Sequence, residues 1–422
     1  MSSALRLETL MSHASQYFDL TESSHQDHLF WLADALLELN DISSNQLSYL
    51  SLQPNTPLEF QLAVKLVCSR RYMLSVSQPI SVGVVYAMWG EHHRLRQKTE
   101  QNPNGEDSLN VKIRQLNWAC QDSMVNWSLY PVDDGCPHKS YDIAKNIVSQ
   151  HDEGQRVTVL HLKDGLAEPK GPLANLTSLS DSSKGGAIIF GCLKALEKQM
   201  DAIIYTDADN SVHLGQLGLI LEPFIERNVQ VVLGNRKHFE SILVKQEERW
   251  GVGIKTLRHM QRMVGSEIFS KGIRDTQAAF KLFSRKALIT ILAAPTVFDF
   301  SFDTDWILAS MKEKLLIETI PFAFIDSSAE SASVVQGPMS TWLTLLTGLV
   351  KAVRARGVKH DAGMAKVIDE HVKTVNDLEL IIDLLPPELK EVSDSVLGQQ
   401  ALMSPESLSH WLAQVKAEQV KM

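Results

Sequence analysis

The sequence predicts an α/β protein: a mixed, mostly parallel sheet with helices on both faces, and helical regions before and after it. Between residues 77 and 335, short apolar and β-branched runs alternate with longer amphipathic stretches, a pattern typical of strand–helix units. Residues 1–76 and 336–422 instead carry apolar residues at helical spacing. We therefore predict three regions with these boundaries, of which the middle one contains the sheet.

Five runs predict the strands of this sheet. They are residues 80–86, 128–132, 157–160, 202–206 and 229–233. Three of them end in polar or charged residues, namely Asp133-Asp134-Gly135, Asp207-Ala208-Asp209 and Gly234-Asn235-Arg236. In open α/β sheets, ligands bind beyond the carboxyl ends of the strands. We therefore expect the chemistry at one edge of the sheet.

The terminal regions contain helix start signals. Thr56 precedes Pro57 and lies three residues before Glu59, which is the pattern of a capped helix. Ser404 and Pro405 begin a last helix in the same way. The polar stretch 168–183 predicts a long loop, and we expect it to close over a ligand.

Composition excludes several classes of protein. The net charge of −9, from 50 acidic and 41 basic residues, argues against a nucleic-acid-binding protein. The four cysteines are scattered singly, which disfavours a zinc site or a disulfide framework. The first residues lack the basic start and apolar run of a signal peptide, and no stretch reaches about 18 uninterrupted apolar residues. We expect a cytoplasmic protein.

Asp207 and Asp209 are the first candidates for chemistry. Two carboxylates spaced i, i+2 at a strand end can both turn toward one cation where the strand gives way to a loop. Hard oxygen ligands suit Mg²⁺ or Mn²⁺, which would bridge phosphate oxygens. Acidic strand ends are common, so this motif alone is weak.

Two further motifs have both a structural and a functional interpretation. Asp133-Asp134-Gly135 is either a tight turn with an acidic helix start or an acceptor for the hydrogen-bond donors of a nucleoside. Lys184-Gly185-Gly186 is either a hinge into a helix or a place where backbone N–H groups and a lysine meet an anion. It lacks the spacing of a Walker loop.

The last candidates lie between residues 271 and 305. A run from Lys271 to Phe283 contains Arg274, Asp275 and Gln277 before a strand-like segment. Asp303 and Asp305 then precede Trp306. A carboxylate here would be either a general base for an acceptor hydroxyl or a cap for the following helix, and the residues themselves favour neither.

Taken in this order, the motifs resemble glycosyltransferase family 2, which has the Rossmann-like GT-A fold. The closest likeness is to the branch that contains dolichyl-phosphate glucosyltransferase and dolichol-phosphate mannose synthase. The resemblance covers residues 79–345, and the run Lys-Gly-Ile-Arg-Asp-Thr-Gln-Ala-Ala-Phe-Lys-Leu-Phe is its most specific part. It implies a glycosyltransferase that moves a hexose, with UDP-glucose favoured as donor, and inverts the anomeric carbon.

The resemblance also implies roles for individual residues. Ala87 to Glu91, Asp133 and Asp134 would hold the nucleoside, and Asp207 and Asp209 would hold Mg²⁺ or Mn²⁺ with the diphosphate. Lys184, Gly185, Arg236 and Arg274 would meet phosphate or developing charge. Asp275, Gln277 and either Asp303 or Asp305 would line the sugar and acceptor pocket.

Two departures from the family bear on the substrates. The first motif has Ala87 and Gly90 where relatives usually have Pro and Asn, so the nucleoside pocket is expected to differ. Between Arg249 and Arg262, where membrane-bound relatives have apolar helices, this chain has four basic residues, which makes burial among lipid chains costly. We therefore expect a water-soluble acceptor rather than a lipid.

Other interpretations stay open. The stretch from Trp342 to Arg356 could form a basic amphipathic helix with weak contact to a membrane surface, although packing against the protein is favoured. The helical ends could support a homo-oligomer. The competing functions are a catalytically inactive sugar-binding or scaffolding module, and a nucleotidyltransferase, which would be expected to place a glycine-rich loop after its first strand.

Overall fold

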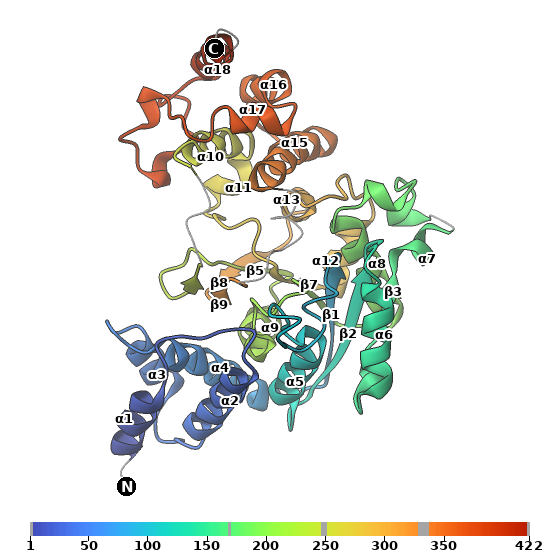
Figure 1. Ribbon diagram of the computed structural model, residues 1–422, viewed down its shortest axis with the longest axis vertical. Coiled ribbons are helices and arrows are strands. Elements are labelled where there is room, and N and C mark those ends of the chain that lie inside the picture. The colour runs from blue at the N-terminus through green and yellow to red at the C-terminus, as the bar shows by residue number, and fades with distance from the viewer. Residues whose placement is uncertain (1–2, 168–169, 246–250, 328–336, 420–422) are drawn as a thin grey trace.

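The computed structural model describes residues 3–167, 170–245, 251–327 and 337–419 (Figure 1). At its centre is a seven-stranded sheet with the order β3-β2-β1-β4-β7-β5-β8. β7 runs antiparallel to β4 and β5, and the other neighbouring strands are parallel. The strands are β1 Ile80–Met88, β2 Val125–Asp133, β3 Leu160–His161, β4 Ala202–Thr206, β5 Val231–Gly234, β7 Phe280–Ser284 and β8 Ile317–Ile320. This confirms the predicted mixed, mostly parallel sheet.

Short strands depart from the sequence prediction. The run predicted at 157–160 contributes only β3 and one bridge between Val157 and Leu129. β8 was not predicted, and neither were β6 (Ile242–Val244) and β9 (Ala323–Ile325), which form a separate parallel pair. Segments of three or four residues are too short to show a clear period of two.

Helices cover both faces of the sheet. Val82 and Val84 of β1 pack toward α5 (Ser108–Cys120) and α9 (Leu217–Arg227), and Val85 packs toward the other face. That second face is covered by α8 (Gly185–Glu197) and α12 (Arg285–Leu292). α8 approaches closely because it has Gly191 where any Cβ would collide with Val85 and Val132. The predicted two-sided covering is confirmed.

The helices before the sheet share a core with the small strand pair. They are α1 (Ser3–His13), α2 (Ser23–Leu37), α3 (Ser44–Ser51) and α4 (Leu58–Ser75). Their buried leucines and Phe60 pack with Ile242, Ala323 and Ile325 of β6 and β9. Figure 1 shows this helical group at one end of the molecule, opposite the C-terminal helices. The predicted helical N-terminal region is therefore attached through an apolar core.

The C-terminal helices continue the main core. They are α15 (Pro338–Arg356), α16 (Ala362–His371), α17 (Val375–Glu379) and α18 (Pro405–Gln419), and they gather around α10 (Ile254–Val264), α11 (Ser266–Ser270) and α13 (Phe302–Lys312) (Figure 1). Leu346, Leu349 and Val353 of α15 are almost fully buried. The apolar face of α15 therefore packs inside the protein, which does not favour its contact with a membrane.

The basic residues of α10 have partners within the protein. Arg258 pairs with Asp394 at 2.7 Å, Arg262 donates to the Asp394 carbonyl, and Lys255 donates to the Lys390 carbonyl at 3.1 Å. Arg249, the fourth basic residue of the segment, lies outside the described residues. In the described part of the chain, no helix combines the length and apolar character needed to cross a membrane.

The stretch predicted as a long loop at 168–183 is more structured than expected. From Lys170 onward it contains two 3₁₀ turns, η2 (Gly171–Leu173) and η3 (Leu179–Asp181), and Glu168 lies outside the described residues. Leu173 and Leu176 are buried in the main core. These apolar residues fix the segment to the core. A prediction from composition misses them because most of the segment is polar.

Candidate active site

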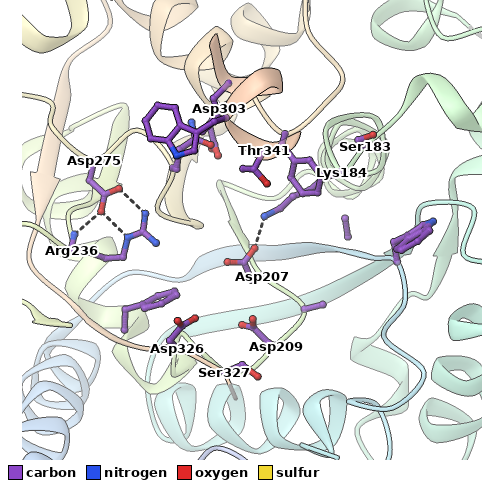
Figure 2. Close-up of a pocket in the computed structure, with 18 of the residues that line it drawn as sticks. Ser183, Lys184, Asp207, Asp209, Arg236, Asp275, Asp303, Asp326, Ser327 and Thr341 are labelled. Atoms are coloured by element: carbon purple, nitrogen blue, oxygen red, sulfur yellow. Dashed lines mark hydrogen bonds and ion pairs between the residues drawn. The ribbon is translucent and has the colours of Figure 1, made fainter. Parts of the chain in front are cut away.

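A cavity of about 500 Å³ lies at the carboxyl edge of the sheet. β1, β4 and β5 end there, and because β7 is antiparallel its first residues start there. The first turn of α13 and the faces of α10 and α15 complete the wall. Figure 2 shows Lys184, Asp207, Asp209, Arg236, Asp275 and Asp303 around this space. These six of the predicted site residues therefore line one cavity at this edge of the sheet.

The acidic pair after β4 faces a lysine. Asp207 and Asp209 both line the cavity, and the Lys184 ammonium forms an ion pair with one Asp207 oxygen (Figure 2). Lys184 precedes α8 with φ of +79°, a left-handed conformation that is uncommon for a side chain-bearing residue. Burial disfavours both charges, but each supports the other: the pKa of Asp207 is lowered and that of Lys184 is raised.

The donor set at Asp207 and Asp209 fits a hard divalent cation that is shared with a substrate. Among the described residues, no group of three or more His, Cys, Asp or Glu side chains could hold a metal alone. Asp209 accepts one hydrogen bond from the Ser211 N–H at 3.0 Å, which leaves its other oxygen available. Mg²⁺ is commonly bound by one or two carboxylates, with phosphate oxygens and water as the remaining ligands. Two carboxylates are therefore sufficient here.

Asp134 and Asp133 have different surroundings. Asp134 lines the cavity and accepts hydrogen bonds from the Ser182 hydroxyl and the Lys184 N–H, both at 2.6 Å. Burial raises the pKa of Asp134 to about 6 despite these bonds. Asp133 is outside the cavity wall and accepts from three backbone N–H groups, those of Gly135, Cys136 and Tyr141. Its geometry is that of a turn and helix start.

Arg236 and Asp275 form a fixed charged pair in the wall. The guanidinium donates to both carboxylate oxygens at 2.9 and 2.8 Å, and the Arg236 N–H adds a third bond at 2.9 Å (Figure 2). Burial alone would raise the pKa of Asp275, but the Arg236 bonds and charge lower it to about 2. Gln277 lies nearby and donates to the Thr304 hydroxyl at 3.3 Å.

Asp303 and Asp305 separate onto two sides of α13. Asp303 lines the cavity, and one of its oxygens accepts from Lys281 at 2.9 Å. Asp305 is fully buried away from the cavity, where it accepts from Arg356 at 2.5 and 2.7 Å and from Thr296 at 2.5 and 3.0 Å. The structure therefore brings Asp303, and not Asp305, to the site.

Ala87 and Glu91 also line the cavity, as the resemblance implies. The Glu91 carboxylate is already paired with Arg94 at 2.9 Å, and the pair lies within reach of Glu106 at 3.5 Å from Arg94. Glu91 is thus part of a buried charge network in the cavity wall.

The structure does not bring three more of the predicted residues to the cavity wall. Besides Asp305, these are Asp133, Gly185 and Arg274. Gly185 packs so tightly that a Cβ would lie 2.6 Å from the Phe298 carbonyl. Arg274 is exposed, and its carbonyl accepts from Lys237 at 2.7 Å. These four residues lie outside the cavity lining, and their predicted roles in binding or catalysis stay predictions.

Sequence reasoning missed a second wall of the cavity. Lys237, Lys245 and Arg258 contribute basic groups, and Trp342 and Leu345 of α15 contribute apolar ones. These residues lie on separate elements with no motif in common. The available signal was the cluster of basic residues at 249–262, which the sequence analysis used only as an argument against a lipid acceptor.

Comparison with known proteins gives a weak likeness. No family model matches the chain. Solved structures of glucosyl-3-phosphoglycerate synthase from Mycobacterium tuberculosis are similar to it. The complex with Mn²⁺, uridine diphosphate and glucosyl-3-phosphoglycerate is 12% identical, and the match covers 71% of this chain and 86% of that one, with a TM-score of 0.45.

Two further structures of that enzyme give similar values. The complex with phosphoglyceric acid is 13% identical, with coverage of 71% and 86% and a TM-score of 0.46. The complex with Mn²⁺, UDP-glucose and phosphoglyceric acid is 13% identical, with coverage of 70% and 84% and a TM-score of 0.45. Such values are too low to support a function.

Proposed function

We propose that the chain is a metal-dependent, inverting glycosyltransferase that moves a hexose from a nucleoside-diphosphate-sugar, with UDP-glucose favoured, to an acceptor hydroxyl or phosphate. The observation that carries the proposal is the group formed by Asp207, Asp209 and Lys184 at the end of β4, in one cavity with Asp303. This arrangement offers a place for a diphosphate and, across the cavity, a carboxylate for an acceptor. The resemblance to family 2 glycosyltransferases supports it.

The donor would lie along the sheet edge. Ala87 and Asp134 line the side expected for the nucleoside, and Asp207 and Asp209 would hold the cation with the diphosphate. A divalent cation bound there would neutralise negative charge on the departing nucleoside diphosphate. Burial would raise the pKa of Asp207, but the positive charges of Lys184 and Arg236 lower it. These charges favour an anionic leaving group.

Asp303 is the proposed general base. It lies in the cavity wall, and no described residue hydrogen-bonds its second oxygen. A carboxylate oxygen open to the cavity can take the proton of an acceptor hydroxyl. The hydroxyl oxygen of the acceptor then attacks the anomeric carbon of the sugar. The bond from that carbon to the diphosphate breaks on the opposite side, which inverts the centre.

The acceptor would enter beside the basic wall. Lys237, Lys245 and Arg258 face the cavity there, and Asp326 is an acidic residue of the same lining. Among the described residues, no carboxylate pairs with the Lys237 ammonium, which donates to the Arg274 carbonyl at 2.7 Å. Positive groups of this kind favour an acceptor with a negative group. We therefore propose a water-soluble acceptor that carries an anionic group.

The test measures release of UDP or GDP from a panel of nucleotide sugars, with and without Mn²⁺, and with neutral and anionic acceptors. Asp209→Asn should reduce turnover at least about 100-fold, because a neutral amide ligates a hard cation poorly. Asp152→Asn changes an exposed aspartate far from the cavity and serves as the matched control. Equal turnover in the wild type and Asp209→Asn, or no release from any sugar, would overturn the proposal.

A further inference from the structure

Lys281 is in an unusual place for a lysine. It is the second residue of β7, a strand enclosed by β4 and β5, and its side chain is fully buried. Lysines are almost never fully buried without a partner, because moving the ammonium out of water is costly. Its neighbours Phe280 and Leu282 are the residues such a strand normally has. The fold alone therefore gives no reason for a lysine here.

One contact of Lys281 connects it to the cavity wall. Its ammonium donates to Asp303 at 2.9 Å and to the Ala278 carbonyl, and it lies 5.2 Å from the centre of the Tyr205 ring. Asp303 is in the first turn of α13, so this ion pair connects β7 to the start of that helix. Of the pair, only Asp303 reaches the cavity.

The other charged groups nearby are paired with one another, so Lys281 and Asp303 are each other's nearest charged partner. Lys184 and Arg236 carry positive charge nearby, and Asp207 and Asp275 carry negative charge, but each of these four has a closer partner among the others. Burial raises the pKa of Asp303 well above its usual range and lowers that of Lys281 well below its own. Burial by itself favours the neutral form of both groups, and the ion pair between them at 2.9 Å is the contact that favours the charged form of each.

We infer that Lys281 is a positioning residue that holds Asp303 in the orientation and the charged form needed to take the acceptor's proton. This inference rests on the proposed function. In the step, the acceptor O–H proton moves to Asp303, the acceptor oxygen bonds to the anomeric carbon, and the bond from that carbon to the diphosphate breaks. Lys281 keeps its protons throughout and remains hydrogen-bonded to the same oxygen of Asp303.

Two substitutions of Lys281 separate its effect on the orientation of Asp303 from its effect on the charge of Asp303. Lys281→Met has a similar unbranched side chain without a donor or charge, and Lys281→Gln keeps a hydrogen-bond donor. At neutral pH, Lys281→Met should lower kcat about 100-fold or more, the usual size of a general-base contribution. Its rate should recover as pH rises and the unpaired Asp303 ionises, while KM for the nucleotide sugar stays unchanged.

In Lys281→Gln, the acid limb of the plot of kcat against pH should shift toward higher pH as it does in Lys281→Met. The loss of kcat that remains at high pH should be smaller than in Lys281→Met. Asp303→Asn should be slow at every pH. A wild-type pH profile for Lys281→Met, or a loss that is equal at every pH, would overturn the inference. If Lys281→Met does not fold, Lys281→Gln is judged by the same two criteria.

A second measurement needs no turnover, so it separates this inference from the proposed function. Infrared difference spectra of wild type against Asp303→Asn, and of Lys281→Met against the double variant, report the charge of this one carboxyl. We expect a protonated-carboxyl band at neutral pH in Lys281→Met and none in wild type. The same band in both proteins would contradict the role of Lys281, whether or not sugar transfer has been detected.

Discussion

Asp275 accepts hydrogen bonds from Arg236 at both carboxylate oxygens, and its side chain is only 3% exposed. Its pKa of about 2 lies below the ordinary value of 3.8. A carboxyl group whose pKa is lower in the folded state stabilises the fold at every pH above its pKa in the unfolded chain. This stabilisation disappears as pH falls from about 4 to 2. The size of the shift corresponds to about 2 kcal/mol at neutral pH.

We therefore expect Asp275→Asn to lower the free energy of unfolding by about 2 kcal/mol at pH 7. The difference from wild type should shrink when urea unfolding is repeated at pH 4 and then at pH 3. Asp152→Asn should differ little from wild type at each pH. A loss for Asp275→Asn that is independent of pH would show that geometry alone, and not the carboxylate charge, is responsible.

Residue spacing explains which site residues the sequence could predict. Asp207 and Asp209 alternate by two at a strand end, so both can face one cation, and both line the cavity. Asp303 and Asp305 have the same spacing but lie on a helix, where positions i and i+2 point about 200° apart. The sequence could not choose between them because the choice depends on where α13 packs. Lys281 was missed because its partner lies on a different element.

At the scale of elements, the pairing of Asp305 with Arg356 ties α13 to the end of α15. The pair is buried, with side-chain exposures of 0% and 9%. Removing one partner of such a pair leaves an uncompensated charge, which costs about 3–5 kcal/mol. Two residues earlier on the same helix, Arg354 pairs with Asp369, and both side chains are 47% exposed. Exposed pairs contribute about 0–1 kcal/mol.

Arg356→Met should therefore destabilise the protein by about 3 kcal/mol in chemical unfolding, against less than about 1 kcal/mol for Arg354→Met. The two variants remove the same side chain from the same helix, so helix propensity and net charge are matched. Equal losses would mean that the buried pair is no more important than the exposed one. Activity should fall with Arg356→Met too, since α13 also carries Asp303.

The long elements were predictable and the short ones were not. β1, β2 and β4 contain apolar and β-branched runs, and the start of α18 at Pro405 follows a recognisable signal. The antiparallel insertion of β7 and the pair of β6 and β9 depend on contacts between distant segments. No local pattern contains this information, because a strand's own residues do not specify the direction of its neighbour.

At the scale of the whole molecule, the three predicted regions stay a prediction, and two of their boundaries are crossed by shared apolar cores. The boundary at 76 falls between α4 and β1, yet Leu62 and Leu66 of α4 pack with Ile325 of β9. The helices after 336 pack in one core with α8 and α13. The predicted homo-oligomer through the helical ends stays a prediction.

We expect one cooperative unfolding transition for the full chain and no active fragment 77–422. Removing residues 1–76 would expose the apolar surfaces of Ile242, Ala323 and Ile325. Calorimetry of the full chain, together with size-exclusion chromatography and turnover of the fragment, provides the check. A monomeric fragment with full activity would show that the N-terminal helices are a separate domain.

The strand order has a consequence for how the protein is made. β7 lies between β4 and β5 but comes after both in the chain. While the ribosome is still adding residues, each of those two strands therefore has an edge with unpaired N–H and C=O groups. Such edges can bind other nascent chains until β7 emerges and closes the gap. Chaperone demand during translation should thus fall sharply once residue 284 has left the exit tunnel.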